Sequence, residues 1–383
     1  MSADILPVYE FLHKTIRNVV PGKALQRRCI EKLRASLFPE VLEDIRITAV
    51  EAVREGTAVR RKIHDASYAP PARVKSIETR LPEGFGAPEA HIPELYEYIF
   101  PDGYCFRTFA LDCRRRFIAD TSAAFNDLYR NNKDIRSRRP VIVNEDAVAL
   151  NTWHASGYYT WLVELAGRLL LCPGWRDKLI CVDDNFTYQD ETFSLLGVPE
   201  EQVLVVADYR LYKFRSLSVV NAPPLRCCVP ALDAVRGLSG LLPREDYEDA
   251  LPKRLYLGRG DIGNRNVENG SELLALLEKY GFQEILCSQY PMHMQIRLAR
   301  NADYIVCTHG AAGTNLLFCR PNVRFLEMFP PEYVDATYIS ITQYLNIEHH
   351  ILRGAKSITS DKNSNFIVDT DKVQQAVELL LRA

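Results

Sequence analysis

The sequence lacks an apolar run of the about 18 residues that a membrane-spanning helix requires. Its first ten residues, MSADILPVYE, include acids where a secretory signal needs a basic start followed by a continuous apolar core. The ten cysteines contain no C-x-x-C pair and no regular spacing, which predicts free thiols in a reducing compartment. We therefore expect a soluble, cytoplasmic protein.

An excess of charge of one sign is also missing. The chain has 47 Lys and Arg against 49 Asp and Glu, and its formal net charge is -2, so no nucleic-acid partner is expected. One stretch, residues 12–37, interleaves basic and apolar positions, and this pattern allows peripheral contact with a membrane surface. A solvated helix that packs on the body is the more ordinary explanation of the same pattern.

Spacings that hold a metal ion are missing as well. Asp183 and Asp184 are adjacent, whereas carboxylates that share one cation need separation, so turn chemistry explains this pair better. His349 and His350 are also neighbours, and in a strand their side chains point to opposite faces. We expect no metal ion, no cofactor and no nicotinamide-dependent dehydrogenase.

What the sequence does contain is a repeated alternation of strand-like and helix-like segments. Its 383 residues suffice for two α/β domains. Short β-prone segments with turns fill residues 74–122, and from Arg139 apolar runs alternate with amphipathic ones, which indicates a parallel sheet flanked by helices. A segment with prolines and glycines, residues 229–252, interrupts this alternation before it resumes. We expect one domain over residues 1–240, a second over 250–365, and a last helix over 366–383 that packs back on the first domain.

The loop after the predicted strand DYIVCT is the strongest candidate site. It reads HGAAGTN over residues 309–315, and ligands of open parallel sheets bind where strands end and helices begin. Small residues let a ligand approach the backbone, the N–H groups of a helix start suit a diphosphate, and His309 adds a donor or a cation. A tight turn with a capping histidine explains this loop sequence almost as well.

Other polar residues follow strands of the second series. Arg259, Arg265 and Asn266 lie in the loop GRGDIGNRN, where arginine guanidinium groups would match phosphate oxygens and stabilise a departing diphosphate. Glu327 ends the segment VRFLE and is placed to accept hydrogen bonds from ribose or sugar hydroxyls. The alternatives are a solvated turn for the loop and a turn cap for Glu327.

Two candidate bases lie in the first half of the chain, in the segment WHASGYYTWLVEL. On a helix Glu164 neighbours Thr160 and Trp161, and partial desolvation by the indole ring would raise the pKa of this carboxyl. A carboxylate of that kind can deprotonate a hydroxyl. His154 is the competing base, and an ordinary buried salt link explains Glu164 equally well.

Taken in order, these segments resemble glycosyltransferase family 61. Residues 255–331 are similar to the family's C-terminal half, and GYYTWLVELAGRL is similar to its Asn-Tyr-Tyr-His-Trp-Leu-x-Glu run, so the resemblance spans about residues 141–344. The matching positions are Arg259, Arg265 with Asn266, Gly281 with Phe282, Gln295 with Ile296, His309 to Ala311 with Asn315, and Glu327. The chain departs from the family pattern at Gly157, Thr160 and Gly167, where Asn, His and Pro are common. These departures lie near the presumed acceptor side.

The resemblance implies an α/β fold of the GT-B type, with two Rossmann-like domains facing a cleft, here preceded by a β-rich lead-in. It implies an inverting transfer, in surface polysaccharide or glycan synthesis, from a nucleotide sugar to a hydroxyl of a glycan or glycolipid acceptor. We expect a UDP-linked donor and no metal. We assign Glu164 or His154 as base on the acceptor side, and donor-binding roles to Arg259, Arg265, Asn266, His309, Gly310, Ala311, Asn315 and Glu327. Alternatives are a sugar-nucleotide-binding protein without catalysis and an epimerase or hydrolase on the same fold.

Overall fold

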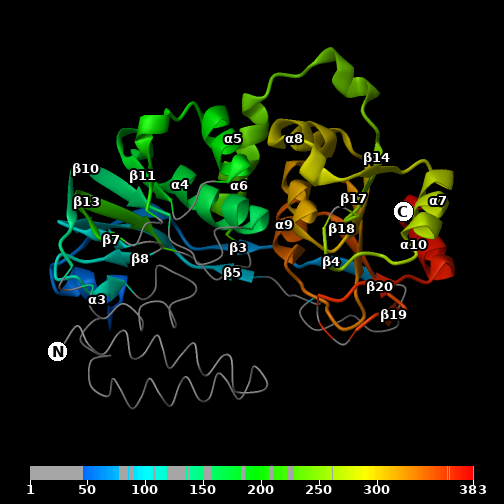
Figure 1. The fold of residues 1–383 in the computed structure, drawn as a ribbon, viewed down its shortest axis with the longest axis horizontal. Coiled ribbons are helices and arrows are strands. Elements are labelled where there is room, and N and C mark those ends of the chain that lie inside the picture. Colours follow the sequence, from blue (N-terminus) through cyan, green and yellow to red (C-terminus); the bar gives the residue numbers. More distant parts are fainter. Residues whose placement is uncertain are drawn as a thin grey trace, which may run out of the picture.

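The computed structural model describes residues 46–76, 85, 90–106, 109–118, 135, 138–150, 157–182, 186–206, 210–221, 228–260, 262–359, 361 and 363–382. Within these residues two large sheets with helices around them form a mixed α/β protein, in agreement with the expected fold class (Figure 1). The basic stretch at residues 12–37 and the pair Asp183 and Asp184 lie outside the described residues.

The first sheet combines the β-rich lead-in with the first alternating series. Its order is β1-β9-β8-β7-β13-β10-β11-β12, with β6 paired to β13 and β2 paired to β6. The neighbours β12, β11, β10 and β13 are parallel, whereas β6 and β7 run antiparallel to β13. The strands are β1 (Arg46–Ile47), β2 (Val59–His64), β6 (Leu95–Pro101), β7 (Tyr104–Phe106), β8 (Phe109–Leu111), β9 (Phe117–Ile118), β10 (Val141–Ala149), β11 (Leu179–Val182), β12 (Val203–Val205) and β13 (Tyr212–Val220).

Helices cover the parallel part of the first sheet. The segment GYYTWLVELAGRLLL forms a helix. Its first part, η3 (Thr160–Ala166), is a π-helix with i→i+5 hydrogen bonds, and α4 (Gly167–Leu171) continues it. A Cβ at Gly167 would stand 2.8 Å from that of Ala231, so the glycine lets the next helix approach. The other helices before β14 are α3 (Ala49–Arg54), η4 (Trp175–Asp177), α5 (Thr187–Leu196), η5 (Glu200–Gln202), α6 (Val229–Arg236), η6 (Gly237–Leu241) and η7 (Asp246–Ala250).

The second sheet is parallel throughout, in the order β15-β14-β16-β17-β18-β4. Its strands are β4 (Arg73–Ser76), β14 (Arg254–Leu257), β15 (Gln283–Ile285), β16 (Tyr304–Thr308), β17 (Arg324–Phe329) and β18 (Glu348–Arg353). Its helices are α7 (Gly270–Lys279), η8 (Cys287–Gln289), α8 (Met292–Asn301), the 3₁₀ helix η9 (Ala311–Phe318), α9 (Ile339–Tyr344) and α10 (Thr370–Arg382). Two small sheets complete the fold, from β3 (Ser67–Ala69) with β5 (Ala90–Ile92) and from β19 (Lys356–Ser357) with β20 (Phe366–Ile367).

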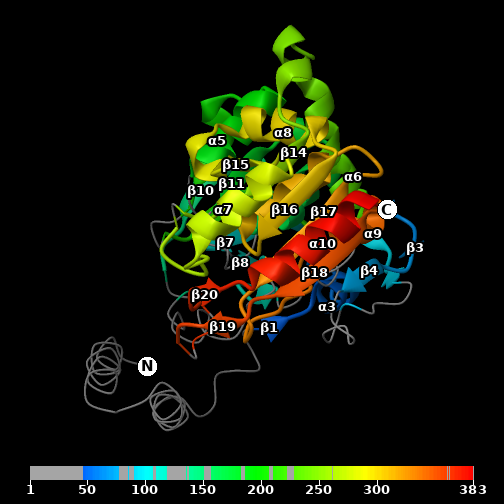
Figure 2. The ribbon, with the colours of Figure 1, turned by 90° about the vertical axis from the view of Figure 1, so that its right-hand side faces the viewer.

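Two chain segments lie elsewhere than the sequence led us to expect. Strand β4 belongs to the lead-in by sequence, yet it pairs with β18 at the edge of the second sheet. The last helix, α10, lies against β17, β18 and α7 of the second sheet, where we had expected a return to the first unit (Figure 2). Its apolar side chains recur at helical spacing and are buried there, at Val373, Ala376, Val377 and Leu380.

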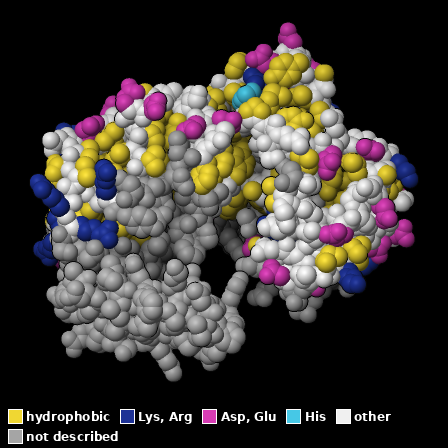
Figure 3. Space-filling view, in the orientation of Figure 1, with side chains coloured by type: hydrophobic (Ala, Val, Ile, Leu, Met, Phe, Trp, Pro, Cys, Tyr) yellow, Lys and Arg dark blue, Asp and Glu magenta, His cyan; other side chains and the backbone are white. Residues whose placement is uncertain are grey.

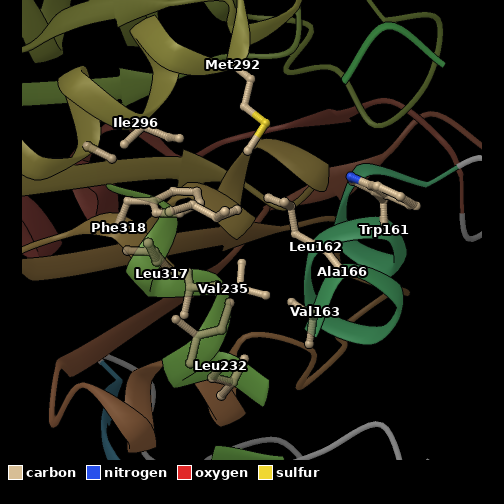
Figure 4. Close-up of a cluster of buried hydrophobic side chains, with 14 of the residues drawn as sticks. Trp161, Leu162, Val163, Ala166, Leu232, Val235, Met292, Ile296, Leu317 and Phe318 are labelled. Atoms are coloured by element: carbon tan, nitrogen blue, oxygen red, sulfur yellow. The ribbon is translucent and has the colours of Figure 1, made fainter. Parts of the chain in front are cut away.

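A continuous hydrophobic cluster joins the units built on the two sheets. From the first unit it takes side chains of η3, α4 and α6, and from the second unit side chains of α8 and η9 (Figure 4). The side chains labelled there are Trp161, Leu162, Val163, Ala166, Leu232, Val235, Met292, Ile296, Leu317 and Phe318. Because these contacts are apolar and buried, they hold η3 against the loops that follow the strands of the second sheet.

Candidate active site

Strand order places the two main candidate loops, after β14 and after β16, side by side. In the second sheet β15 lies on one side of β14 and β16 on the other, so the winding direction reverses between β14 and β16. Ligands of doubly wound sheets bind beyond the carboxyl ends of the strands at such a reversal. Strand β14 leads into Arg259 and strand β16 into His309, so both residues lie at this switch point.

His309 is held by a carboxylate beneath it. Its Nδ1 lies 2.6 Å from Glu327 Oε1, and His349 Nε2 lies 2.9 Å from the other oxygen of the same carboxylate. Burial alone would raise the pKa of Glu327, but the two histidines outweigh it, and the pKa lies below its ordinary value. Both oxygens therefore already have partners. In this geometry Glu327 supports His309 and does not face a ribose or sugar hydroxyl.

Arg259 lies directly over the glycine that follows His309. A Cβ added at Gly310 would stand 1.6 Å from Arg259 Nη1, so only glycine leaves room for the guanidinium. Asn264 holds the same side chain, since Arg259 Nε donates to its carbonyl at 3.2 Å and Nη2 to its Oδ1 at 2.8 Å. The guanidinium is thus fixed beside the loop that begins with His309.

Arg265 packs against the ring of Tyr333, which in turn packs against His309. Its Cζ lies 5.3 Å from the ring centre of Tyr333, and that ring lies 5.4 Å from the imidazole of His309. Arg265 has a positive φ of 56°, a conformation that non-glycine residues seldom adopt and that recurs at functional sites. The structure therefore brings Arg259, Arg265 and His309 together.

Asn315 has a different role from the one expected. Its Oδ1 accepts the hydroxyl of Tyr158 at 3.0 Å, and its Nδ2 donates to Gln295 Oε1 at 2.9 Å. Gln295 in turn donates to the carbonyls of Cys287 and Tyr290, both at 2.9 Å. The amide of Asn315 thus links the start of the η3 helix to α8 across the two units.

The loop over residues 309–315 is more buried than its sequence suggests. Tyr338 donates to the carbonyl of Gly310, and its ring would lie 2.6 Å from a Cβ at Gly313. Ala311 is exposed, whereas Gly313 and Asn315 are buried. The segment continues as the 3₁₀ helix η9, and Ala311 at its first position is exposed, whereas Gly310 before it is buried.

Comparison with known proteins identifies the family. Residues 158–326 match the family described as Glycosyltransferase 61. The chain carries a glycosyltransferase family 61 domain and is a glycosyltransferase. No curated protein matches the chain. The matched range includes η3 and both switch-point loops of the glycosyltransferase, and it ends one residue before Glu327.

The two candidate bases of the glycosyltransferase differ in what can be said of them. His154 lies outside the described residues. Glu164 is half-buried on the π-helix η3, and π-helical turns are frequent at functional sites. Burial lowers the pKa of Arg168, and the Glu164 carboxylate, four residues earlier, opposes that effect. Glu164 therefore has a charged neighbour, as the salt-link alternative requires.

Asn266 is occupied by structural contacts. Its N–H donates to Asn365 Oδ1 at 3.0 Å, its carbonyl accepts from Phe366 N at 2.9 Å, and its Nδ2 donates to the carbonyl of Ile262. These bonds fasten the loop that carries Arg265 to the segment before β20. Asn266 shapes the loop in this structure.

The expectation that the sequence excludes a nicotinamide-dependent dehydrogenase requires a correction, because the loop after β14 carries a glycine pattern typical of such enzymes. Residues 258–263 have the spacing G-x-G-x-x-G, and Glu284 follows about twenty residues later, so the sequence alone does not set a dehydrogenase aside. Glu284 does lie close, since its Oε1 would stand 2.3 Å from a Cβ at Gly258. The dinucleotide pattern, however, requires these glycines to open a helix, and α7 begins only at Gly270.

Several residues that complete the site were not singled out as site residues by the sequence. His349 was considered only as a metal ligand. Tyr158 and Asn264 lay in quoted motifs without an assigned role, and Tyr333 and Tyr338 lay in no motif. The alternation of side-chain directions along β18 did predict that the two histidines face opposite sides of the sheet. His349 faces Glu327, whereas His350 faces the other way and contacts Glu348 at 2.7 Å, as neighbours in a strand must.

A hollow of about 530 Å³ lies between the units, beside the middle and end of α5 and the start of α8. Glu191 lines it and accepts the N–H of Met292 at the start of α8. None of the predicted site residues lines this hollow, which is bordered by Asp190, Glu191, Ser194, Leu195, Leu242, Met292 and His293.

Among the described residues, no group of three or more His, Cys, Asp and Glu side chains is placed to hold a metal ion. In the same part of the chain no helix is long and apolar enough to span a membrane. On the face in Figure 3 acidic and basic side chains are interspersed, and hydrophobic side chains reach the surface where the units meet.

Proposed function

We propose that this glycosyltransferase has a GT-B arrangement and transfers a sugar from a nucleotide sugar, UDP-linked, to a hydroxyl of a glycan or glycolipid acceptor. The reaction inverts the anomeric centre, needs no metal, and serves surface polysaccharide or glycan synthesis. We place the enzyme in the cytoplasm, with peripheral membrane contact through residues 12–37. The observation that supports the donor site is the convergence of Arg259, Arg265 and His309 at the switch point of the second sheet.

The proposed chemistry is a single displacement. A base, Glu164 or His154, takes the proton of the acceptor hydroxyl. The hydroxyl oxygen then bonds to the anomeric carbon of the sugar, and the bond from that carbon to the diphosphate breaks. Negative charge then develops on the leaving diphosphate. Arg259, Arg265 and His309 stabilise it, together with the backbone at Gly310 and Ala311, because fixed cations and N–H groups bind a developing anion without reorganisation.

The test compares donor binding and turnover in single variants. A thermal-shift screen over UDP-, GDP- and CMP-linked sugars first identifies the donor, since a ligand that binds only the native state raises the unfolding temperature. We expect Arg259→Ala and His309→Ala to lose at least about tenfold in donor affinity, the equivalent of one charge-assisted hydrogen bond, and to lose transfer. Arg244→Ala is the matched control, because Arg244 is exposed and its ion pair among the described residues is with the exposed Asp249.

The outcomes separate the candidate functions. Donor stabilisation with transfer to an acceptor supports the proposal, whereas donor conversion without an acceptor indicates an epimerase or a hydrolase. Normal turnover in both Arg259→Ala and His309→Ala would place the donor site elsewhere.

A further inference from the structure

Glu327 lies between two histidines, and only one of them lies in the proposed donor site. The carboxylate is completely buried, with Oε1 on His309 Nδ1 at 2.6 Å and Oε2 on His349 Nε2 at 2.9 Å. His349 is itself completely buried, packed beside Phe325 and Phe85 with ring centres 4.7 and 5.8 Å away. His349 therefore acts on the site only through Glu327.

The positions of the protons follow from this geometry. A carboxylate oxygen accepts hydrogen bonds, so each histidine nitrogen that faces Glu327 carries a proton. His309 is thus protonated at Nδ1 and His349 at Nε2. The remaining nitrogen of His349, Nδ1, is buried and has no partner among the described residues. A proton there would be an unsatisfied buried donor, which carries a free-energy cost.

These assignments leave one exchangeable proton in the group. Because Nδ1 of His309 is committed to Glu327, His309 gains or loses its proton only at Nε2. With a proton at Nε2 the imidazole is a cation and a hydrogen-bond donor, and the single negative charge of Glu327 balances it. This is the form that a diphosphate would bind.

We propose that His349 is a positioning residue: by binding the second oxygen of Glu327 it keeps that carboxylate ionised and oriented, and so confines the exchangeable proton of His309 to Nε2. This inference rests on the donor site proposed above. Burial acts to raise the pKa of Glu327, and the hydrogen bond from His349 is one of the contacts that hold this pKa below its ordinary value while it fixes the second carboxylate oxygen.

Other titratable groups lie near Glu327 and His309, and their charges affect the titration of this carboxylate. Cys307 and Tyr338 interact with the charge of Glu327, and burial raises the pKa of each of them. Burial also raises the pKa of Tyr333, which lies beside His309. Arg259 is the cation on the other side, where it opposes the rise in the pKa of Cys307. These groups come from β16, from the loops after β14 and β17, and from the residues just before α9.

The experiment reads proton positions in the ligand-free enzyme by NMR. Two-bond ¹H–¹⁵N spectra of ¹⁵N-histidine-labelled protein distinguish Nδ1–H from Nε2–H, and ¹³C shifts of labelled glutamate report the ionisation of Glu327, which Glu327→Gln assigns. We expect neutral His309 to carry Nδ1–H and neutral His349 to carry Nε2–H. In His349→Phe, which keeps the ring packing, we expect the pKa of Glu327 to rise by about one unit, the effect of one hydrogen bond to a charge.

Two variants provide the controls. His349→Gln offers an amide N–H to Glu327 and should restore the native ionisation. His350→Phe changes the neighbouring histidine of the same strand, which contacts Glu348 and not Glu327, and should leave both signals unchanged. With UDP as probe, calorimetry at neutral pH should show roughly tenfold weaker binding to His349→Phe than to His350→Phe.

The failures of the two proposals are distinguishable. Unchanged Glu327 ionisation and unchanged UDP affinity in a folded His349→Phe would overturn the role of His349, as would Nε2–H on neutral His309. If the native enzyme binds neither UDP nor any nucleotide sugar, the proposed donor site is wrong. The NMR signals of Glu327 and His309 still decide whether His349 positions the Glu327 carboxylate.

Discussion

At the scale of single residues, the space around Gly310 explains why the loop after β16 has a glycine directly after His309. The backbone there is extended, with φ 173° and ψ 174°, a conformation that any residue adopts. The glycine is needed because Arg259 occupies the position of its missing Cβ. The glycine therefore serves the position of the arginine.

Gly310→Ala should weaken donor binding without unfolding the protein. The added methyl group displaces the guanidinium of Arg259, so we expect UDP affinity to fall by about tenfold or more, the loss of one charge-assisted hydrogen bond. Calorimetry with UDP measures the affinity, and circular dichroism checks the fold. Gly260→Ala is the matched control, because among the described residues no atom of a non-adjacent residue lies within 4 Å of a Cβ at Gly260. Equal affinities in the two variants would show that Arg259 does not bind the diphosphate.

The sequence predicted the switch-point residues better than their roles. Arg259 and His309 follow apolar strands directly, and the strand-end rule places such residues at a ligand edge. The roles of Glu327 and Asn315 depend on partners far along the chain, His349 and Tyr158, and no local pattern encodes such long-range contacts.

At the scale of elements, the π-helix η3 departs most clearly from its sequence pattern. Local periodicity indicates a helix over these residues and cannot distinguish i→i+4 from i→i+5 hydrogen bonding. The choice is made by tertiary packing, since Trp161 donates to Thr192 at 2.9 Å and Tyr158 bonds to Asn315 across the units. Glu164 takes its position on the helix from this turn.

Glu164→Gln tests whether that position serves catalysis. An amide cannot take a proton from an acceptor hydroxyl, so we expect the turnover rate to fall by about a hundredfold or more with donor affinity unchanged. Steady-state kinetics and calorimetry measure the two quantities. Arg168→Met is the companion variant, because it removes the charged neighbour of Glu164 and keeps the carboxylate. If both variants lose stability and Glu164→Gln retains turnover, Glu164 is a salt-link partner and not the base.

At the scale of the whole molecule, the alternation of strands and helices predicted a mixed α/β protein, and the sheets with their surrounding helices confirm this fold class. It did not predict that β4 crosses to the second sheet or that α10 remains there, because both depend on which apolar face is left uncovered. Nor could it show that the largest hydrophobic cluster draws on both units. That cluster bears directly on how the molecule unfolds.

A shared core predicts a single cooperative unfolding transition. The three tryptophans all precede residue 240, so their fluorescence reports the first unit and, through Trp161, the cluster that it shares with the second. Leu273 is completely buried in a separate cluster of the second unit, and Leu273→Ala should cost about 2–5 kcal/mol. We expect this variant to shift the urea midpoints of tryptophan fluorescence and far-ultraviolet circular dichroism equally, because unfolding of one unit exposes the shared cluster of the other. A shift confined to circular dichroism would show that the units unfold independently, and the cluster would then be a weak interface.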